Sequence, residues 1–239
     1  MLRDALLLRM LGFGFFSGLP LPLSVFTLQQ WFTTAGVSVH SVGLTAWLGL
    51  PYTVKFLWSP LFDRAPPRWV GGLGRRRFWL LVVQPLLAFA CAMLALTDPG
   101  VNAAHTAMAA GALTFLSASQ DILIDAWRIE TFPEKRQGAA LAAYVWGYRT
   151  AMLTSGSGAI ALSTVLGWHS AMGCMAALLA LSPLLTLVVA EPSVHLRLGP
   201  PGFLAGVTAP RNFSGRCRTG QKRRRTVCDQ QDRGGGIAG

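Results

Sequence analysis

Long apolar stretches constrain the fold of this chain more than any other feature of its sequence. Each stretch approaches the roughly 20 residues that a helix needs to cross the hydrocarbon core of a membrane. Apolar residues make up 52% of the chain and charged residues only 13%, which is about half the charged share of a soluble domain. The sequence therefore predicts an all-α membrane protein with six transmembrane helices. These helices are expected near residues 6–28, 41–60, 78–97, 107–127, 139–163 and 168–190.

The composition changes abruptly after Pro192. Residues 1–192 contain all the apolar stretches, whereas residues 193–239 are polar and rich in Gly and Arg. We expect a six-helix membrane domain over 1–192 and a disordered basic tail over 193–239. Most of the net charge of +11 lies in this tail, so the charge does not indicate a nucleic-acid-binding protein. We expect contact with membrane lipid and no nucleic-acid partner.

The connections between the apolar stretches alternate in their content of Arg and Lys. The N-terminus, residues 64–77 and residues 128–136 are basic, whereas the intervening connections have neither residue type. Short loops that carry Arg and Lys stay on the cytoplasmic side of a membrane. The alternation therefore predicts an even number of crossings, with both termini in the cytoplasm.

Ionisable side chains inside the stretches are candidate functional residues, because each costs about 2.5 to 3.5 kcal/mol at the bilayer centre. Lys55 falls in the second stretch, Asp121 and Asp125 in the fourth, and Arg149 in the fifth. The first stretch has neutral polar side chains such as Ser17, and the third and sixth have no charge in their interiors. We expect the first, second, fourth and fifth helices to surround a polar cavity, with the other two outside it. This arrangement is a three-plus-three repeat.

The two aspartates of the fourth stretch lie on one helical face. That face holds Ser117, Asp121, Asp125 and Arg128 at helical spacing. Two carboxylates on adjacent turns repel each other, and apolar surroundings disfavour their charge. This suits a proton-coupling or substrate-binding role for at least one aspartate. The alternative is permanent pairing of both with Arg149 and Lys55, although the Lys55 ammonium can instead reach the interface and Arg149 can instead bind an anionic substrate.

Glycines recur at short spacing in two of the stretches. Gly14 and Gly18 are four residues apart, and Gly156 and Gly158 recur in the fifth stretch. Small residues permit close contact between transmembrane helices. We therefore expect these glycines to serve packing rather than ligand binding.

Five ordered motifs resemble the N-terminal half of the AmpG muropeptide permeases, a branch of the major facilitator superfamily. The motifs are GFFSGLPLPLSVFTLQQWFTTAGV, LGLPYTVKFLWSPLFDR, GRRRFWLL, SASQDILIDAWR and GAALAAYVWGYRTAMLTSG. The resemblance runs from about residue 12 to the AEP at 190–192. It implies a proton-coupled importer of the bacterial inner membrane, which carries anhydromuropeptides into the cytoplasm for peptidoglycan recycling and, in some bacteria, β-lactamase induction.

The same resemblance implies two groups of functional residues. The family's acidic pair in SQDIxxDA matches Asp121 and Asp125, and Gln120 joins them as a candidate for proton coupling or substrate binding. The segment FDRAPPRWVGGLGRRR is similar to the superfamily's charged loop between helices 2 and 3, which is linked to gating between access states. Its candidate residues are Asp63, Arg64, Gly74, Arg75, Arg76 and Arg77.

The chain departs from the family after Pro192. Family members continue into a second set of spans, whereas residues 193–239 contain no comparable apolar run. We interpret the chain as truncated to one half, by a frameshift or a premature end; a natural disordered tail is the alternative. Alternating access rocks one half of a transporter against the other. We therefore expect no transport by the monomer, whereas a homodimer could restore two halves.

Two other function classes compete with a working permease. One is an inactive fragment of such a permease. The other is a membrane-embedded enzyme, since paired aspartates can hold a metal ion or act as acid and base. Metal sites in such enzymes usually gather more carboxylates, and Asp63, Glu130 and Glu134 fall in the connections. We expect no enzyme, no metal site and no cofactor.

Overall fold

The computed structural model describes residues 4–38, 43, 45–62 and 74–189, and every regular element in these ranges is a helix. The chain divides into two units, Met1–His195 and Leu196–Gly239, and all described residues belong to the first. The predicted boundary at residue 192, the predicted tail, Asp63 and Arg64 lie outside the described residues. The prediction of a helical fold is confirmed.

The first helical run is interrupted by two prolines. It consists of α1 (Ala5–Gly18), α2 (Pro20–Pro22), the π-helix η1 (Leu23–Thr27) and α3 (Leu28–Thr34). A proline has no N–H to donate one turn back, so the hydrogen-bond pattern changes where Pro20 and Pro22 enter the run. Ser24 Oγ donates to the Pro20 carbonyl oxygen at 2.9 Å. Side chain and backbone together thus stabilise a helix that the prolines alone would break.

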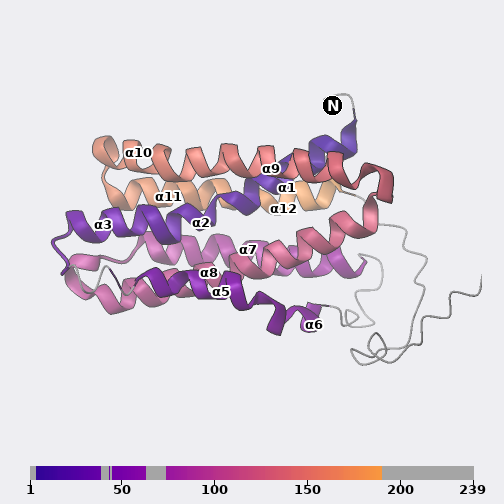
Figure 1. Cartoon of the computed structure of the whole chain (residues 1–239). Helices are drawn as coiled ribbons and strands as arrows, with labels where there is room; N and C mark the ends of the chain where they lie inside the picture. The colour runs from indigo at the N-terminus through magenta and orange to yellow at the C-terminus, as the bar shows by residue number, and fades with distance from the viewer. Residues whose placement is uncertain (1–3, 39–42, 44, 63–73, 190–239) are drawn as a thin grey trace, which may run out of the picture. The chain divides into compact units, whose positions relative to one another are not determined.

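Residues 45–62 form short helices in series, which differs from the continuous helix expected over 41–60. The pieces are η2 (Thr45–Gly49), α5 (Leu50–Val54), η3 (Lys55–Leu57) and α6 (Ser59–Phe62). Pro51 lies in the first turn of α5, where the missing N–H is tolerated, and Pro60 has the same place in α6. The segment still runs beside α8 and contacts it (Figure 1).

Glycines and caps delimit the remaining helices. Gly74 (φ 76°) immediately precedes α7, and Gly167 (φ 81°) separates α10 from α11, both in the left-handed region that favours glycine. Asp98 caps α8 by accepting a hydrogen bond from the Gly100 N–H at 2.8 Å. The helices are α7 (Arg75–Ala95), α8 (Pro99–Thr131), η5 (Glu134–Arg136), α9 (Gln137–Leu153), the π-helix η6 (Thr154–Gly158), α10 (Ala159–Leu166), α11 (Trp168–Leu179) and α12 (Ser182–Val188).

Four of the described helical runs are long and apolar enough to cross a membrane. They are Ala5–Thr34, Arg75–Ala95, Pro99–Thr131 and Trp168–Val188. These runs match the first, third, fourth and sixth predicted spans. The fifth predicted span lies within the helical run of α9, η6 and α10, which is not among the four. Six crossings therefore stay a prediction.

The chain runs back and forth between the two ends of a helical bundle (Figure 1). α1 packs along α9, and α7 contacts both α8 and α11. One buried apolar cluster includes Trp31, Leu94 and Met172. A second includes Phe13 and Trp127, whose ring centroids are 5.2 Å apart. The interior is thus filled by side chains from helices that are distant in sequence.

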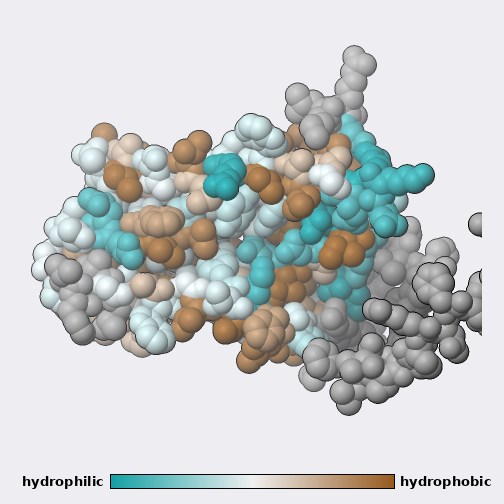
Figure 2. Space-filling view, in the orientation of Figure 1, coloured by the Kyte–Doolittle hydropathy of each residue, from teal (hydrophilic) through white to brown (hydrophobic). Residues whose placement is uncertain are grey.

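The described parts of the basic segments predicted to share one side of the membrane lie at one end of the bundle. Arg76 at the start of α7 pairs with Glu130 near the end of α8. Arg136 in η5 pairs with Asp4 just before α1. Figure 2 shows the largest cluster of hydrophilic residues at this end, on the right of the view. Their common location agrees with the alternation of basic connections read from the sequence.

Candidate functional site

The contact between α1 and α9 brings two backbones together at glycines. A Cβ atom added at Gly14 would lie 2.1 Å from the Tyr144 carbonyl oxygen. One added at Gly147 would lie 2.0 Å from the Leu11 carbonyl oxygen. No side chain fits at such distances, so both positions require glycine. The close packing predicted for Gly14 is confirmed, whereas Gly147 was missed.

This contact holds Ser17 of α1 beside Asp121 of α8. Ser17 Oγ donates to Asp121 Oδ1 and also lies 2.8 Å from the Tyr144 hydroxyl oxygen of α9. Both Ser17 and Asp121 are buried. A hydroxyl can donate to a carboxylate or accept from a carboxylic acid, so Ser17 can hold Asp121 with or without a proton. Three helices thus converge on one carboxyl group.

All three tyrosines of the chain gather around Asp121. Tyr144 is hydrogen-bonded to Ser17, and its ring centroid is 6.0 Å from that of Tyr148. Tyr52 of α5 and Tyr148 of α9 both lie within the electrostatic range of the Asp121 carboxylate. These residues were not predicted from the sequence. A signal existed, since Tyr52 and Tyr148 fall inside predicted spans rather than at the span ends, where tyrosine is usual.

Gln120 and Ser117 extend this buried polar region along α8. Both residues are fully buried, and neither the Gln120 amide atoms nor Ser117 Oγ has a hydrogen-bond partner among the described residues. The part of the predicted polar face that holds Ser117 and Asp121 is therefore buried in the bundle. Ser117 Oγ and both amide atoms of Gln120 are thus buried polar atoms for which the described residues supply no hydrogen-bond partner.

Asp125 is placed differently from Asp121. It pairs with Arg128 Nη2 at 3.3 Å, and 42% of its side chain is exposed. Lys55 is partly buried and Arg149 is exposed, and neither forms an ion pair with any residue in the described ranges. Lys55 of η3 lies within electrostatic range of Asp121. The structure therefore gathers Gln120, Asp121 and Lys55, while Arg149 stays apart from both aspartates.

The arginines at the start of α7, predicted to belong to a gating loop, bind the ends of two other helices. Arg75 and Arg76 pair with Glu130 Oε1 of α8 at 3.1 and 2.7 Å. Arg77 donates to the Leu187 carbonyl oxygen of α12 at 2.8 Å. These bonds tie the start of α7 to α8 and α12. A gating role for this junction stays a prediction.

The two π-helices meet inside the bundle. Thr27 Oγ1 of η1 donates to the Ser155 carbonyl oxygen of η6 at 3.0 Å, and both residues are fully buried. Short π-helical turns inside longer helices are frequent at functional sites. The first and fifth predicted spans therefore contact each other at two places along their length. One is the close contact at Gly14 and Gly147, and the other is this hydrogen bond.

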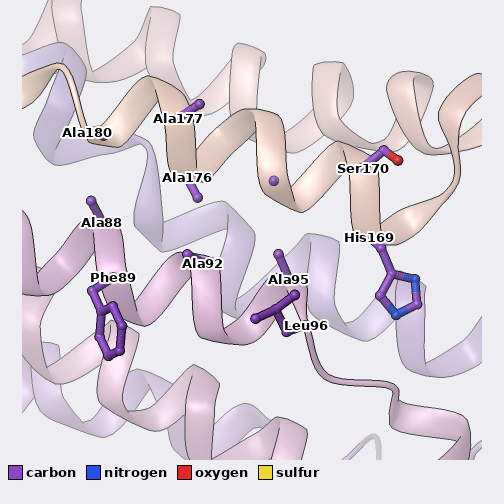
Figure 3. Close-up of a pocket in the computed structure, with 11 residues that line it drawn as sticks. Ala88, Phe89, Ala92, Ala95, Leu96, His169, Ser170, Ala176, Ala177 and Ala180 are labelled. Atoms are coloured by element: carbon purple, nitrogen blue, oxygen red, sulfur yellow. The ribbon is translucent and has the colours of Figure 1, made fainter.

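A groove of about 730 Å³ lies between α7 and α11 (Figure 3). Its lining has no acidic or basic side chain apart from His169, and it shares no residue with the cluster around Asp121. The lining is formed by Ala88, Phe89, Ala92, Ala95, Leu96, His169, Ser170, Gly173, Ala176, Ala177 and Ala180. We do not assign the polar site to this groove.

Several curated relatives of the chain are named permeases or transporters. No protein-family model matches the chain. The chain is 42% identical to the anhydromuropeptide permease of Escherichia coli K12, over 90% of this chain and 43% of that protein. It is 31% identical to the protein named AmpG 1 of Rickettsia conorii, over 79% of this chain and 45% of the relative. A Haemophilus influenzae protein is 34% identical over 77% of this chain and 43% of its own length.

These comparisons correct one expectation and confirm another. The match to the Escherichia coli permease covers 216 residues, so it extends beyond Pro192, where we expected the resemblance to end. The frameshift hypothesis is not tested by this match and stays a prediction. The names of the relatives and the apolar helices indicate a multi-pass membrane protein. The resemblance is confirmed: the chain is a homologue of the AmpG anhydromuropeptide permeases, and it spans less than half the length of the curated relatives it matches.

Proposed function

We propose that this chain forms one helical part of a proton-coupled importer that carries anhydromuropeptides into the bacterial cytoplasm. The observation that carries the proposal is Asp121, a carboxyl group buried in a membrane-spanning helix and hydrogen-bonded to Ser17 of another. An ionisable group inside a transmembrane helix is a functional candidate by default. The relative at 42% identity is named for transport of this substrate class.

We assign the coupled proton to Asp121 rather than to Asp125. The hydroxyls of Ser17 and Tyr144 can each donate or accept, so their contacts persist when Asp121 gains or loses a proton. Asp125 already has a cationic partner in Arg128 and is partly exposed. Asp121 is therefore the carboxyl whose surroundings accommodate both protonation states.

The remaining parts of the proposal follow from the bundle. The end of the bundle that holds Arg76 and Arg136 faces the cytoplasm, because basic segments stay on that side of the inner membrane. The chain crosses the membrane six times, so both termini are on the cytoplasmic side. The first, second, fourth and fifth spans surround the transport path. The arginine junction at the start of α7 takes part in gating. We propose transport rather than an enzymatic reaction, because the relatives are named permeases and transporters.

A chimera tests this proposal. The matching part of the Escherichia coli anhydromuropeptide permease is replaced by this chain, and uptake of labelled anhydromuropeptide is measured in cells without their own permease. We expect uptake that a protonophore abolishes. Asp121→Asn is expected to abolish uptake because an amide cannot exchange the proton. The matched change Asp125→Asn removes the charge that pairs with Arg128 and is expected to reduce uptake several-fold.

Two further arms separate the alternatives. The chain expressed alone is expected to give no uptake as a monomer, since alternating access needs a second half; uptake by the chain alone would indicate a homodimer. Uptake by the chimera that survives Asp121→Asn would contradict the assignment of the proton. A chimera that reaches the membrane but imports nothing would favour the inactive-fragment hypothesis.

A further inference from the structure

Four buried polar atoms beside Asp121 lack a hydrogen-bond partner among the described residues. They are the Tyr52 hydroxyl, Ser117 Oγ and both amide atoms of Gln120. The Tyr52 hydroxyl of α5 lies near the hydroxyls of Ser117 and Ser24, so it faces this part of α8. Ser117 and Gln120 are three residues apart on α8, which puts them on the same side of the helix. Folded proteins pair the great majority of such atoms, so this group is suited to a partner from outside the chain.

The chemistry of these atoms restricts that partner. Tyr and Ser hydroxyls each donate and accept, and the Gln amide has two donors and one acceptor. None of the three side chains carries a charge at neutral pH. Burial of a charged ligand group against them would leave its charge uncompensated, which is costly. A neutral group that both donates and accepts fits them best, as a hydroxyl or an amide does.

We propose that Tyr52, Ser117 and Gln120 form a subsite that binds an uncharged hydroxyl or amide group of the transported molecule. The subsite adjoins Asp121, which follows Gln120 in sequence and lies one turn from Ser117. Neutral recognition and proton exchange are thereby assigned to adjacent positions on one helix. The inference rests on the proposed function, because it takes an anhydromuropeptide as the source of the bound group. Both the sugar part and the peptide part of such a molecule offer hydroxyl or amide groups.

Binding to the purified full chain in lipid nanodiscs tests the subsite. Affinity for labelled anhydromuropeptide is measured for the wild type, Tyr52→Phe and Ser117→Ala, each variant lacking one oxygen. We expect each variant to bind about five- to tenfold more weakly, as for loss of one hydrogen bond. Ser119→Ala is the control, since its hydroxyl is buried on the same helix but already has partners: it donates to the Phe115 carbonyl oxygen at 2.8 Å and accepts from Trp58 Nε1 at 3.2 Å. Its affinity is expected within twofold of the wild type.

Competition identifies the group that is bound. The sugar without its peptide and the peptide without its sugar are each used as competitors. The variants should weaken binding only of the competitor that supplies the hydroxyl or amide group.

Ser117→Thr, which keeps the hydroxyl, is expected to bind like the wild type. The melting temperature of each variant reports whether it is folded.

Each outcome decides the proposal. Wild-type binding with unchanged affinity in Tyr52→Phe and Ser117→Ala would overturn the subsite and leave the proposed function standing. Ser117→Thr as weak as Ser117→Ala would show that the position acts through packing, which also overturns the subsite. A folded wild-type chain that binds neither the anhydromuropeptide nor its parts would overturn the subsite in this chain, whereas uptake by the chimera decides the proposed function separately.

Discussion

The contact between α1 and α9 and the contact between α7 and α11 are both rich in small residues, yet only the first is closed. At Gly14 and Gly147 the backbones touch so closely that a Cβ atom would lie about 2 Å from a carbonyl oxygen. Between α7 and α11 the alanines instead border a groove of about 730 Å³ (Figure 3). Small residues therefore permit close packing without imposing it. The closed contact is also the one that positions Ser17 and Tyr144 at Asp121.

Among the variants that test this comparison, Gly147→Ala is expected to lower the free energy of unfolding most. The added methyl group must displace the Leu11 backbone, so we expect a loss of about 3 kcal/mol in the free energy of unfolding. Unfolding by SDS, followed by circular dichroism in detergent, measures this change. The matched control is Gly173→Ala in α11, where an added Cβ would meet nothing within 4 Å. It should be neutral or stabilise the helix by up to about 1 kcal/mol. Equal losses in the two variants would remove the distinction between the contacts.

Ala151→Leu and Ala177→Leu enlarge one side chain in each contact. Ala151 is fully buried in α9, and its Cβ already lies close to Gly18. We expect Ala151→Leu to cost about 2 kcal/mol through overpacking. Ala177 lines the open groove, so Ala177→Leu should stay within about 0.5 kcal/mol. The same SDS titration measures both, and a large loss for Ala177→Leu would show that the groove closes in solution.

Ser17→Ala tests whether the closed contact serves the site as well as the fold. The change removes the hydroxyl that bridges Asp121 and Tyr144. We expect a loss of about 1 to 2 kcal/mol in stability and, in the chimera with the Escherichia coli permease, about tenfold lower uptake. Ser170→Ala, which removes an exposed hydroxyl at the groove, is the control and should change neither quantity. Unaltered uptake in Ser17→Ala would separate the α1–α9 contact from transport.

Thr27→Val should have the smallest measurable effect on the α1–α9 side. It keeps the shape of the side chain but leaves the Ser155 carbonyl oxygen without the Thr27 donor. We expect a loss of about 1 kcal/mol, read from the same unfolding curves. Thr164→Val is the comparison, because that exposed hydroxyl bonds only within its own helix, to the Ala161 carbonyl oxygen. A loss no larger than in Thr164→Val would mean that the π-helices are joined by packing alone.

Spacing along a single helix was the reliable part of the sequence analysis. It placed Ser117 and Asp121 on one face and predicted close packing at Gly14, because both depend on the period of one helix. The partner of Asp121 depends instead on how two helices are rotated against each other. Ser17 and Asp121 are 104 residues apart in sequence, and no local pattern fixes that rotation. The meeting of the tyrosines could not be predicted for the same reason.

Close packing was predicted at Gly14 and at Gly156, and the structure shows it only at Gly14. A signal for Gly147 was present in the sequence, since Ala143 and Ala151 lie four residues to either side and both are buried. The prediction of tight packing was made instead for Gly156 and Gly158. A Cβ atom at Gly156 would lie 3.7 Å from Pro22 Cβ, which is an ordinary contact. Small residues at four-residue spacing were thus a better guide in this helix than glycine alone.

The π-helix η1 has a consequence for the residues that follow it. A π-turn accommodates one residue more than an α-turn, and each residue advances an α-helix by about 100°. Trp31 and Phe32, which follow η1 on α3, are 3% and 1% exposed. Deletion of one residue between Leu23 and Thr27 would swing both aromatic rings around the helix axis. The number of residues in this short segment therefore decides which side of α3 is buried in the bundle. A single deletion would exchange the buried side chains of α3 for others, as several simultaneous substitutions would.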